Sequence, residues 1–234
     1  MTTNTPTGQD HPPTTMDDRF AANLRGFGPV GILAILTILA GNLVVIPLSA
    51  VLVLLWAWRS HTPWREIGYV RPKNWFVGPL IGIVFGVVFK LVMKAVIMPL
   101  LGADPINQAY HYLVDNPAAI PTTLFALIIG AGFGEETLFR GYLFERLGKL
   151  FGTGTPAKVW IVLLTSAWFA LLHYPTQGLA GVEQAAVVGL VFGTLFAVTG
   201  RLWMLMWAHA AFNVTAYVII YWNLESQVAH LFFK

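Results

Sequence analysis

The chain has 234 residues, of which 56% are hydrophobic and only 11% are charged. Soluble domains carry about 25% charged residues, so this composition excludes an ordinary soluble domain and indicates a membrane protein with several spans. The lack of cysteine excludes disulfides, a thiol nucleophile and a cysteine metal site. The net charge of +3 comes with basic residues in short links between apolar blocks, which is typical of membrane orientation, and we expect no nucleic-acid partner.

The beginning of the chain divides into a polar and an apolar part. Residues 1–24 are rich in Pro and Thr, and we predict a disordered tail there, followed by one transmembrane domain over 25–234. The first apolar block covers 28–58 and is interrupted at Gly41-Asn42 and at Pro47. It predicts either one kinked helix or a tight pair of short ones, and the side of the N-terminus depends on which is present.

Later apolar blocks alternate with links of different charge. The link over 59–75 carries four basic residues and one acid, so we assign it to the cytoplasmic side. Small residues in the next block, Gly78, Gly82 and Gly86, are spaced for close helix crossing. The remaining blocks cover 76–102, about 121–140, 159–173, 185–200 and 202–222, with an outer loop expected from Gln177 to Glu183. The pattern predicts an all-α, polytopic transmembrane bundle of about 6–8 membrane helices.

Two adjacent glutamates and an arginine lie within the third of these blocks. Residues four apart share a helix face, so Glu136 and Arg140 are predicted to form an ion pair that makes a buried acid tolerable. Glu135 is rotated about 100° onto another face, where Arg140 cannot serve it equally. We therefore favour Glu135 as a general base, against the alternative of a second packing contact.

Two histidines and an asparagine follow in later blocks. His173 lies one turn after Phe169, and taken alone it is more typical of a structural residue at a helix end. His209 and Asn213 share a face of the last block, and polar side chains are costly in a bilayer unless they bond each other or a ligand. A polar contact between helices is the structural alternative. The depths of these residues in their blocks are compatible with one cavity shared with Glu135.

Other charged residues carry weaker signals. Lys90 and Lys94 lie one turn apart in an apolar block, and we expect them to snorkel or to pair with an acid. Holding a substrate carboxylate is the lesser alternative for these lysines. Glu145 and Arg146 are interpreted as solvated charges of a cytoplasmic link.

Three motifs in chain order resemble the CPBP family of CAAX proteases and bacteriocin-processing enzymes, also called the Abi family. They are EETLFR at 135–140, FALLH at 169–173 and HAAFN at 209–213, all in apolar context. The segment WREIGYVRPKNW at 64–75 is also similar to a family loop, so the resemblance covers about 59–215. Each motif alone is weak, whereas the ordered triplet within membrane spans is specific.

The resemblance implies a membrane-embedded endopeptidase acting on a membrane-associated or lipid-modified, CAAX-like protein or peptide in the bilayer. By motif position, Glu135 and His173 would activate water, while His209 and Asn213 would stabilise the oxyanion. The residues expected to organise the site are Glu136, Arg140 and Phe169.

Several alternatives stay open at this stage. A glutamate-activated water without a cofactor is favoured, but His and carboxylate ligands also suit zinc, which Glu135, His173 and His209 would then hold. A non-catalytic scaffold or bacteriocin-immunity protein could keep the same fold. A proton-coupled transporter would favour paired half-repeats with broken helices, and no such repeat is visible. We expect a multi-pass protein of the prokaryotic plasma membrane.

Overall fold

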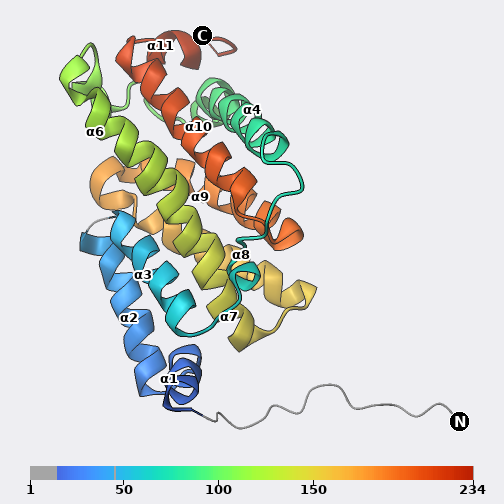
Figure 1. Cartoon of the computed structure of the whole chain (residues 1–234). Coiled ribbons are helices and arrows are strands. Elements are labelled where there is room, and N and C mark those ends of the chain that lie inside the picture. The colour runs from blue at the N-terminus through green and yellow to red at the C-terminus, as the bar shows by residue number, and fades with distance from the viewer. Residues whose placement is uncertain (1–14, 45, 234) are drawn as a thin grey trace, which may run out of the picture.

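A computed structural model describes residues 15–44 and 46–233 of the chain. The described residues form helices and turns without strands, so the predicted all-α bundle is confirmed (Figure 1). The α-helices are α1 Met16–Arg25, α2 Pro29–Val44, α3 Ile46–Arg59, α4 Val77–Val92, α5 Met98–Leu100, α6 Ile120–Phe125, α7 Leu143–Phe151, α8 Thr155–Leu171, α9 Tyr174–Thr199, α10 Trp203–Tyr221 and α11 Glu225–Ala229. Short 3₁₀ helices cover Trp64–Ile67, Gln108–Leu113 and Pro117–Ala119, and π-helical segments cover Met93–Ile97, Ala126–Glu135 and Thr137–Tyr142.

The beginning of the chain differs from the predicted tail. Residues 1–14 lie outside the described part, but α1 occupies most of the rest of the segment. Thr15 and Asp18 form a capping box, in which each side chain accepts a hydrogen bond from the other residue's backbone N–H. This motif satisfies amides that a helix start otherwise leaves free, so the Thr- and Asp-containing stretch begins a helix where composition suggested disorder.

The first apolar block forms a pair of short helices. α2 and α3 meet at the interruption before Pro47 and pack against each other along their lengths (Figure 1). α1 and α2 together are bent by 59°. Of the two alternatives for this block, the structure therefore shows the tight pair.

Four helical stretches are long and apolar enough to cross a membrane: Val77–Leu100, Pro117–Phe151, Tyr174–Thr199 and Trp203–Tyr221. The bent α1–α2 pair makes a fifth if it is one span. Two more apolar helices, Pro47–Arg59 and Thr155–Leu171, are shorter than these. The predicted number of 6–8 membrane helices is therefore reached only when the short helices are counted with the spans.

The stretch from Pro117 to Phe151 runs the length of the bundle, and α4 and α10 lie beside each other on one side of it (Figure 1). A Cβ added to Gly82 would lie 2.3 Å from the Met204 carbonyl oxygen, and one on Gly86 would lie 2.1 Å from that of Ala208. Only glycine permits this approach of α4 to α10, as the small-residue spacing predicted.

Two expected links are helical instead. The predicted outer loop from Gln177 to Glu183 is part of α9, where Gly178 has a φ of 62° and kinks the helix. The predicted cytoplasmic link after Arg140 continues as helix to Phe151. In both places packing against neighbouring helices outweighs the polar and glycine residues that suggested a loop.

Candidate active site

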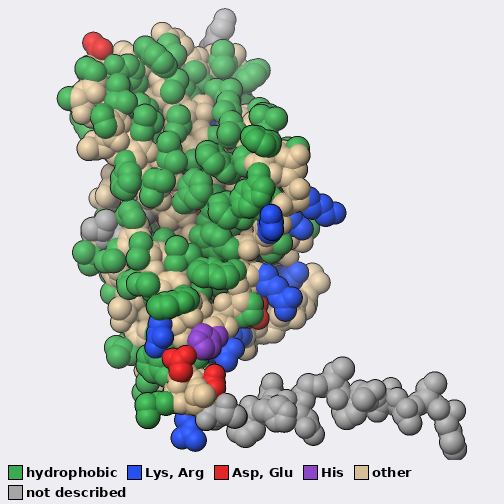
Figure 2. Space-filling model, viewed as in Figure 1, with side chains coloured by type: hydrophobic (Ala, Val, Ile, Leu, Met, Phe, Trp, Pro, Cys, Tyr) green, Lys and Arg blue, Asp and Glu red, His purple; other side chains and the backbone are tan. Residues whose placement is uncertain are grey.

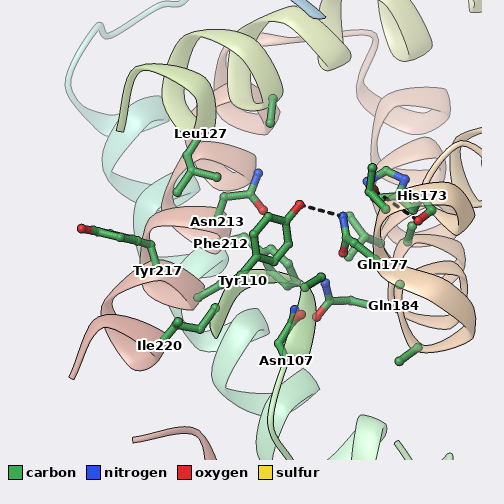
Figure 3. Close-up of a pocket in the computed structure, with 18 of the residues that line it drawn as sticks. Asn107, Tyr110, Leu127, His173, Gln177, Gln184, Phe212, Asn213, Tyr217 and Ile220 are labelled. Carbon is green, nitrogen blue, oxygen red and sulfur yellow. Dashed lines mark hydrogen bonds between the residues drawn. The ribbon is translucent and has the colours of Figure 1, made fainter. Parts of the chain in front are cut away.

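A cavity of about 910 Å³ lies among α4, the Ala126–Glu135 segment, α9 and α10. Figure 3 shows His173, Gln177 and Gln184 on one side of it and Phe212 and Asn213 on the other. A volume of this size suits a peptide or another drug-sized ligand. The cavity lies among the helices that carry the three sequence motifs.

Glu136, Arg140 and His209 form a fully buried cluster beside this cavity. Glu136 Oε1 accepts a hydrogen bond from Arg140 Nη1 at 2.8 Å, which confirms the predicted pair one helical turn apart. The same oxygen lies 2.7 Å from His209 Nδ1 on α10. Because the Glu136 carboxylate can only accept, His209 carries a proton on Nδ1 and its Nε2 is left for other partners.

Glu135 occupies a different face of the same helix, as the 100° rotation predicts. Its Oε2 lies 3.7 Å from His209 Nε2, and its side chain lines the cavity. Glu136 has an exposed fraction of 0%, whereas Glu135 retains 9%. His209 thus lies between the two acids, with Nδ1 facing Glu136 and Nε2 facing Glu135.

Phe169 lies in the last turn of α8, and His173 lies in the turn between α8 and α9. His173 Nδ1 lies 2.8 Å from the Phe169 carbonyl oxygen, which can only accept, so Nε2 is the nitrogen without a proton in the neutral ring. The Phe169 ring packs edge-on against the His173 ring at 4.7 Å and the His209 ring at 6.1 Å between centroids. The guanidinium of Arg140 lies 4.9 Å from the same ring. Phe169 therefore fixes both histidines.

Asn213 lies one turn after His209 and also lines the cavity. Within the described part of the chain its side-chain amide makes no hydrogen bond. Glu135, His173, His209 and Asn213 are thus brought to the same cavity, while Glu136, Arg140 and Phe169 pack behind or between them. The structure leaves the chemical role of each residue a prediction.

Residues 117–215 match the family model described as "Rce1-like: Type II CAAX prenyl endopeptidase Rce1-like". This region contains all three motifs and the four polar side chains that meet at the cavity. Over this region the chain is similar to the Rce1-like family of type II CAAX prenyl endopeptidases. No curated protein and no solved structure matches the chain significantly.

This similarity supports a CAAX-type intramembrane protease in general. Together with the apolar helices, it supports an integral membrane protein, and the family description implies a membrane-associated protein substrate. The matched region excludes the first 116 residues, so α1–α5 and the loop after them are not part of the similarity.

The side-chain positions test whether this site could hold a metal ion. Among the described residues, no group of three or more His, Asp or Glu side chains is placed to hold a metal ion. Nδ1 of His209 is engaged by Glu136 and Nδ1 of His173 by the Phe169 carbonyl, which leaves Nε2 of each ring as the possible ligand atom, so these two contacts do not decide the fit. Glu135, His173 and His209 as placed do not form the three-ligand set that catalytic zinc uses, and we derive no step through a metal.

Sequence reasoning missed three polar residues of the cavity. Gln177 Nε2 donates to the Tyr110 hydroxyl at 3.1 Å, which connects the loop after α5 to α9 (Figure 3). Burial raises the pKa of Tyr110 above its ordinary value. Gln184 also points into the cavity (Figure 3). Gly181, Gln184 and Val188 line the cavity and are spaced three and four residues apart, as on one face of a helix. This spacing could have indicated the cavity wall, but it is not apparent when 177–183 is interpreted as a loop.

The two intramembrane lysines have different partners. Lys94 Nζ forms an ion pair with Glu225 Oε1 at 3.2 Å, as one of the two expectations for these residues predicted. Lys90 instead donates to the neutral side chain of Gln184 at 2.7 Å. Both lysines line the cavity.

Proposed function

We propose that the protein is an endopeptidase that hydrolyses a peptide bond in a membrane-associated or lipid-modified, CAAX-like protein, using Glu135, His173, His209 and Asn213. The observation that carries this proposal is the convergence of these four side chains, from three separate helical stretches, on one cavity. If these polar side chains served only to hold the helices together, they would not need to line a cavity. The family match supports the coarser class of reaction, and the arrangement of the side chains supports the residue roles.

Hydrolysis needs a base for water, an acid for the leaving amine and donors for the oxyanion. In this proposal Glu135 removes a proton from water as its oxygen attacks the scissile carbonyl carbon. The tetrahedral intermediate then collapses, the C–N bond breaks, and the proton is delivered to the leaving amine. The free Nε2 of His173 holds the water by accepting its second hydrogen.

The oxyanion forms on the carbonyl oxygen of the scissile bond. Asn213 supplies an amide donor, which is unengaged among the described residues. His209 can donate only from Nε2, since Nδ1 already donates to Glu136. The imidazole must therefore carry protons on both nitrogens at this step, and Glu136 is placed to stabilise that cation.

Orientation follows from the distribution of charge. Lys and Arg side chains gather in the half of the molecule towards the α1 end, over α1, α7 and the link after α3, while hydrophobic side chains cover most of the visible flank (Figure 2). By the positive-inside bias we place this end in the cytoplasm. We also propose that the protein resides in a prokaryotic plasma membrane, as expected from the sequence.

The proposal is tested by incubating the reconstituted protein with a farnesylated CAAX peptide and identifying the products by mass spectrometry. Wild type, Glu135→Gln and His209→Ala are compared with and without a chelator. We expect cleavage by wild type alone, insensitive to chelation, with each substitution lowering the rate by about 10²–10⁴-fold. Inhibition by the chelator would contradict the metal-free mechanism, and full activity of Glu135→Gln would contradict the assigned base.

A further inference from the structure

Lys90 is a buried lysine in the wall of the cavity. Its side chain comes from the last turn of α4, is 6% exposed and lines the same cavity as Glu135 and His209. Its ammonium donates to Gln184 Oε1 at 2.7 Å and lies 4.8 Å from the centroid of the Phe212 ring. Neither partner carries a negative charge.

Lys94, one turn further along, provides an internal contrast. It pairs with Glu225 at 3.2 Å and also donates to the Pro105 carbonyl. The Glu225 carboxylate is further engaged by the backbone N–H of Asn107 at 2.9 Å. Across the described part of the chain, Lys90 has no carboxylate within ion-pair distance. Burying a charged lysine without a counter-ion is costly, so an anion bound in the cavity beside Lys90 would stabilise its charged form.

We propose that Lys90 and Gln184 bind the C-terminal carboxylate of the substrate, so that the enzyme selects peptide bonds near a free chain end. This inference rests on the proposed peptidase function and adds a specificity-determining pair to it. Lys90 supplies the charge. Gln184 accepts from Lys90 through its oxygen and, among the described residues, its amide N–H groups have no other partner, so they can donate to the same carboxylate.

Lys90 and Gln184 lie near the residues that hold the reacting bond. Phe212, over which the Lys90 ammonium lies, is the residue before Asn213 and three residues after His209, about 4.5 Å of helix rise. Phe192 connects the two regions, since its ring lies 5.5 Å from that of His209 and 6.1 Å from that of Phe89, the neighbour of Lys90. An extended peptide spans at most about 3.5 Å per residue. We therefore expect a carboxylate at Lys90 to belong to a residue a few positions beyond the bond held at Glu135 and Asn213.

The carboxylate provides what this part of the cavity lacks. It supplies the counter-charge that Lys94 obtains from Glu225, and it forms charge-assisted hydrogen bonds in a site shielded from water. Replacing it with a neutral amide keeps the shape of the peptide but removes the charge. Substrates extended far beyond the bond would place uncharged backbone at Lys90 and leave the cation unpaired.

The experiment compares a farnesylated CAAX peptide bearing a free C-terminal carboxylate with the same peptide amidated at its C-terminus. Wild type, Lys90→Met, Gln184→Leu and the control Lys158→Met, which replaces an exposed lysine outside the cavity, are reconstituted in the same liposomes, and kcat/KM is measured for both peptides. We expect wild type and Lys158→Met to prefer the acid by about 10- to 100-fold. In Lys90→Met the ratio of kcat/KM for the acid to kcat/KM for the amide falls to about one. In Gln184→Leu this ratio falls to a value between those of wild type and Lys90→Met.

A binding measurement separates this proposal from the proposed function. Fluorescent versions of both peptides are titrated into Glu135→Gln with and without Lys90→Met, which requires no turnover. If wild type cleaves neither peptide but Glu135→Gln binds the acid more tightly in a Lys90-dependent manner, the peptidase assignment fails and the carboxylate site stands. Equal binding of acid and amide, or a preference that survives Lys90→Met in a folded protein, overturns the carboxylate site. Thermal unfolding of each variant establishes that it is folded.

Discussion

Two buried acid–arginine clusters lie about two to three helical turns apart on the same long helix, Pro117–Phe151. They have different surroundings. In the first, Glu136 and Arg140 lie against His209, and the adjacent Glu135 faces the cavity. In the second, Glu145 and Arg146 are each 3% exposed and pair with one another. Neither residue of the second pair lines the cavity.

The second cluster has the contacts of a structural joint. Arg146 donates to the Arg25 carbonyl at 2.8 Å, at the end of α1, and its guanidinium lies 4.5 Å from the Trp56 ring on α3. It therefore ties α1 and α3 to α7. The comparison teaches that burial of charge alone does not mark an active site. The distinguishing feature is an acid such as Glu135 that is placed at a cavity beside a histidine from another helix.

The largest effect is expected from Arg140→Met. The substitution leaves Glu136 buried without its arginine, which costs about 3–5 kcal/mol of stability, and it also disturbs the orientation of His209. We expect a lower unfolding temperature together with a loss of cleavage per folded molecule. Adding Glu136→Gln to this variant should recover stability but not cleavage, and recovery of both would contradict the comparison.

Arg146→Met should separate stability from activity. Glu145 keeps an ion pair with the half-exposed Lys149, so the expected loss is smaller, about 2–3 kcal/mol. Cleavage per folded molecule should stay within about twofold of wild type, because catalysis does not use this cluster. Thermal unfolding and peptide cleavage measured on the same preparations check this. A large loss of kcat at wild-type stability would remove the distinction between the clusters.

Phe169→Leu tests whether the ring holds the two histidines. Loss of its edge contacts should lower kcat by about tenfold and stability by about 1 kcal/mol, with little change in KM. Trp168→Leu is the control, since this neighbour is 37% exposed on the outer side of α8. An equal effect of the two substitutions would indicate a general packing defect of α8.

The smallest effect is expected from Tyr110→Phe. Burial raises the pKa of Tyr110, so the folded state holds the proton more tightly than the unfolded state, whose tyrosine ionises near pH 10. Stability must therefore fall as pH rises above about 10. Without the hydroxyl, unfolding temperatures should decline less steeply between about pH 9 and 11. At neutral pH the lost bond to Gln177 should cost only about 1 kcal/mol.

Local rules predicted part of the site well. The four-residue spacing of Glu136 and Arg140 fixes their contact, and the one-residue offset of Glu135 places it on another face, because both follow from helix geometry alone. The insertion of His209 between the two acids could not be read from spacing, since it depends on how α10 packs against the long helix.

Other predictions failed where distant helices decide the environment. Glu145 and Arg146 resemble solvated link charges in sequence, but α1 and α3 cover them. Gln177 precedes a glycine in a polar stretch, which suggested a loop, yet the segment packs as a kinked helix and carries Gln184 to the cavity wall. In each case tertiary packing overrides the local pattern.

The most direct test of the central claim is the rate of peptide cleavage per folded molecule in Glu135→Gln compared with Glu145→Gln. Both substitutions remove one negative charge from a buried glutamate of the same helix. The account predicts that Glu135→Gln loses cleavage by about 10²–10⁴-fold with an unchanged unfolding temperature, whereas Glu145→Gln unfolds earlier but cleaves at the wild-type rate while folded. Equal loss of cleavage in both variants, or wild-type cleavage by Glu135→Gln, would contradict it.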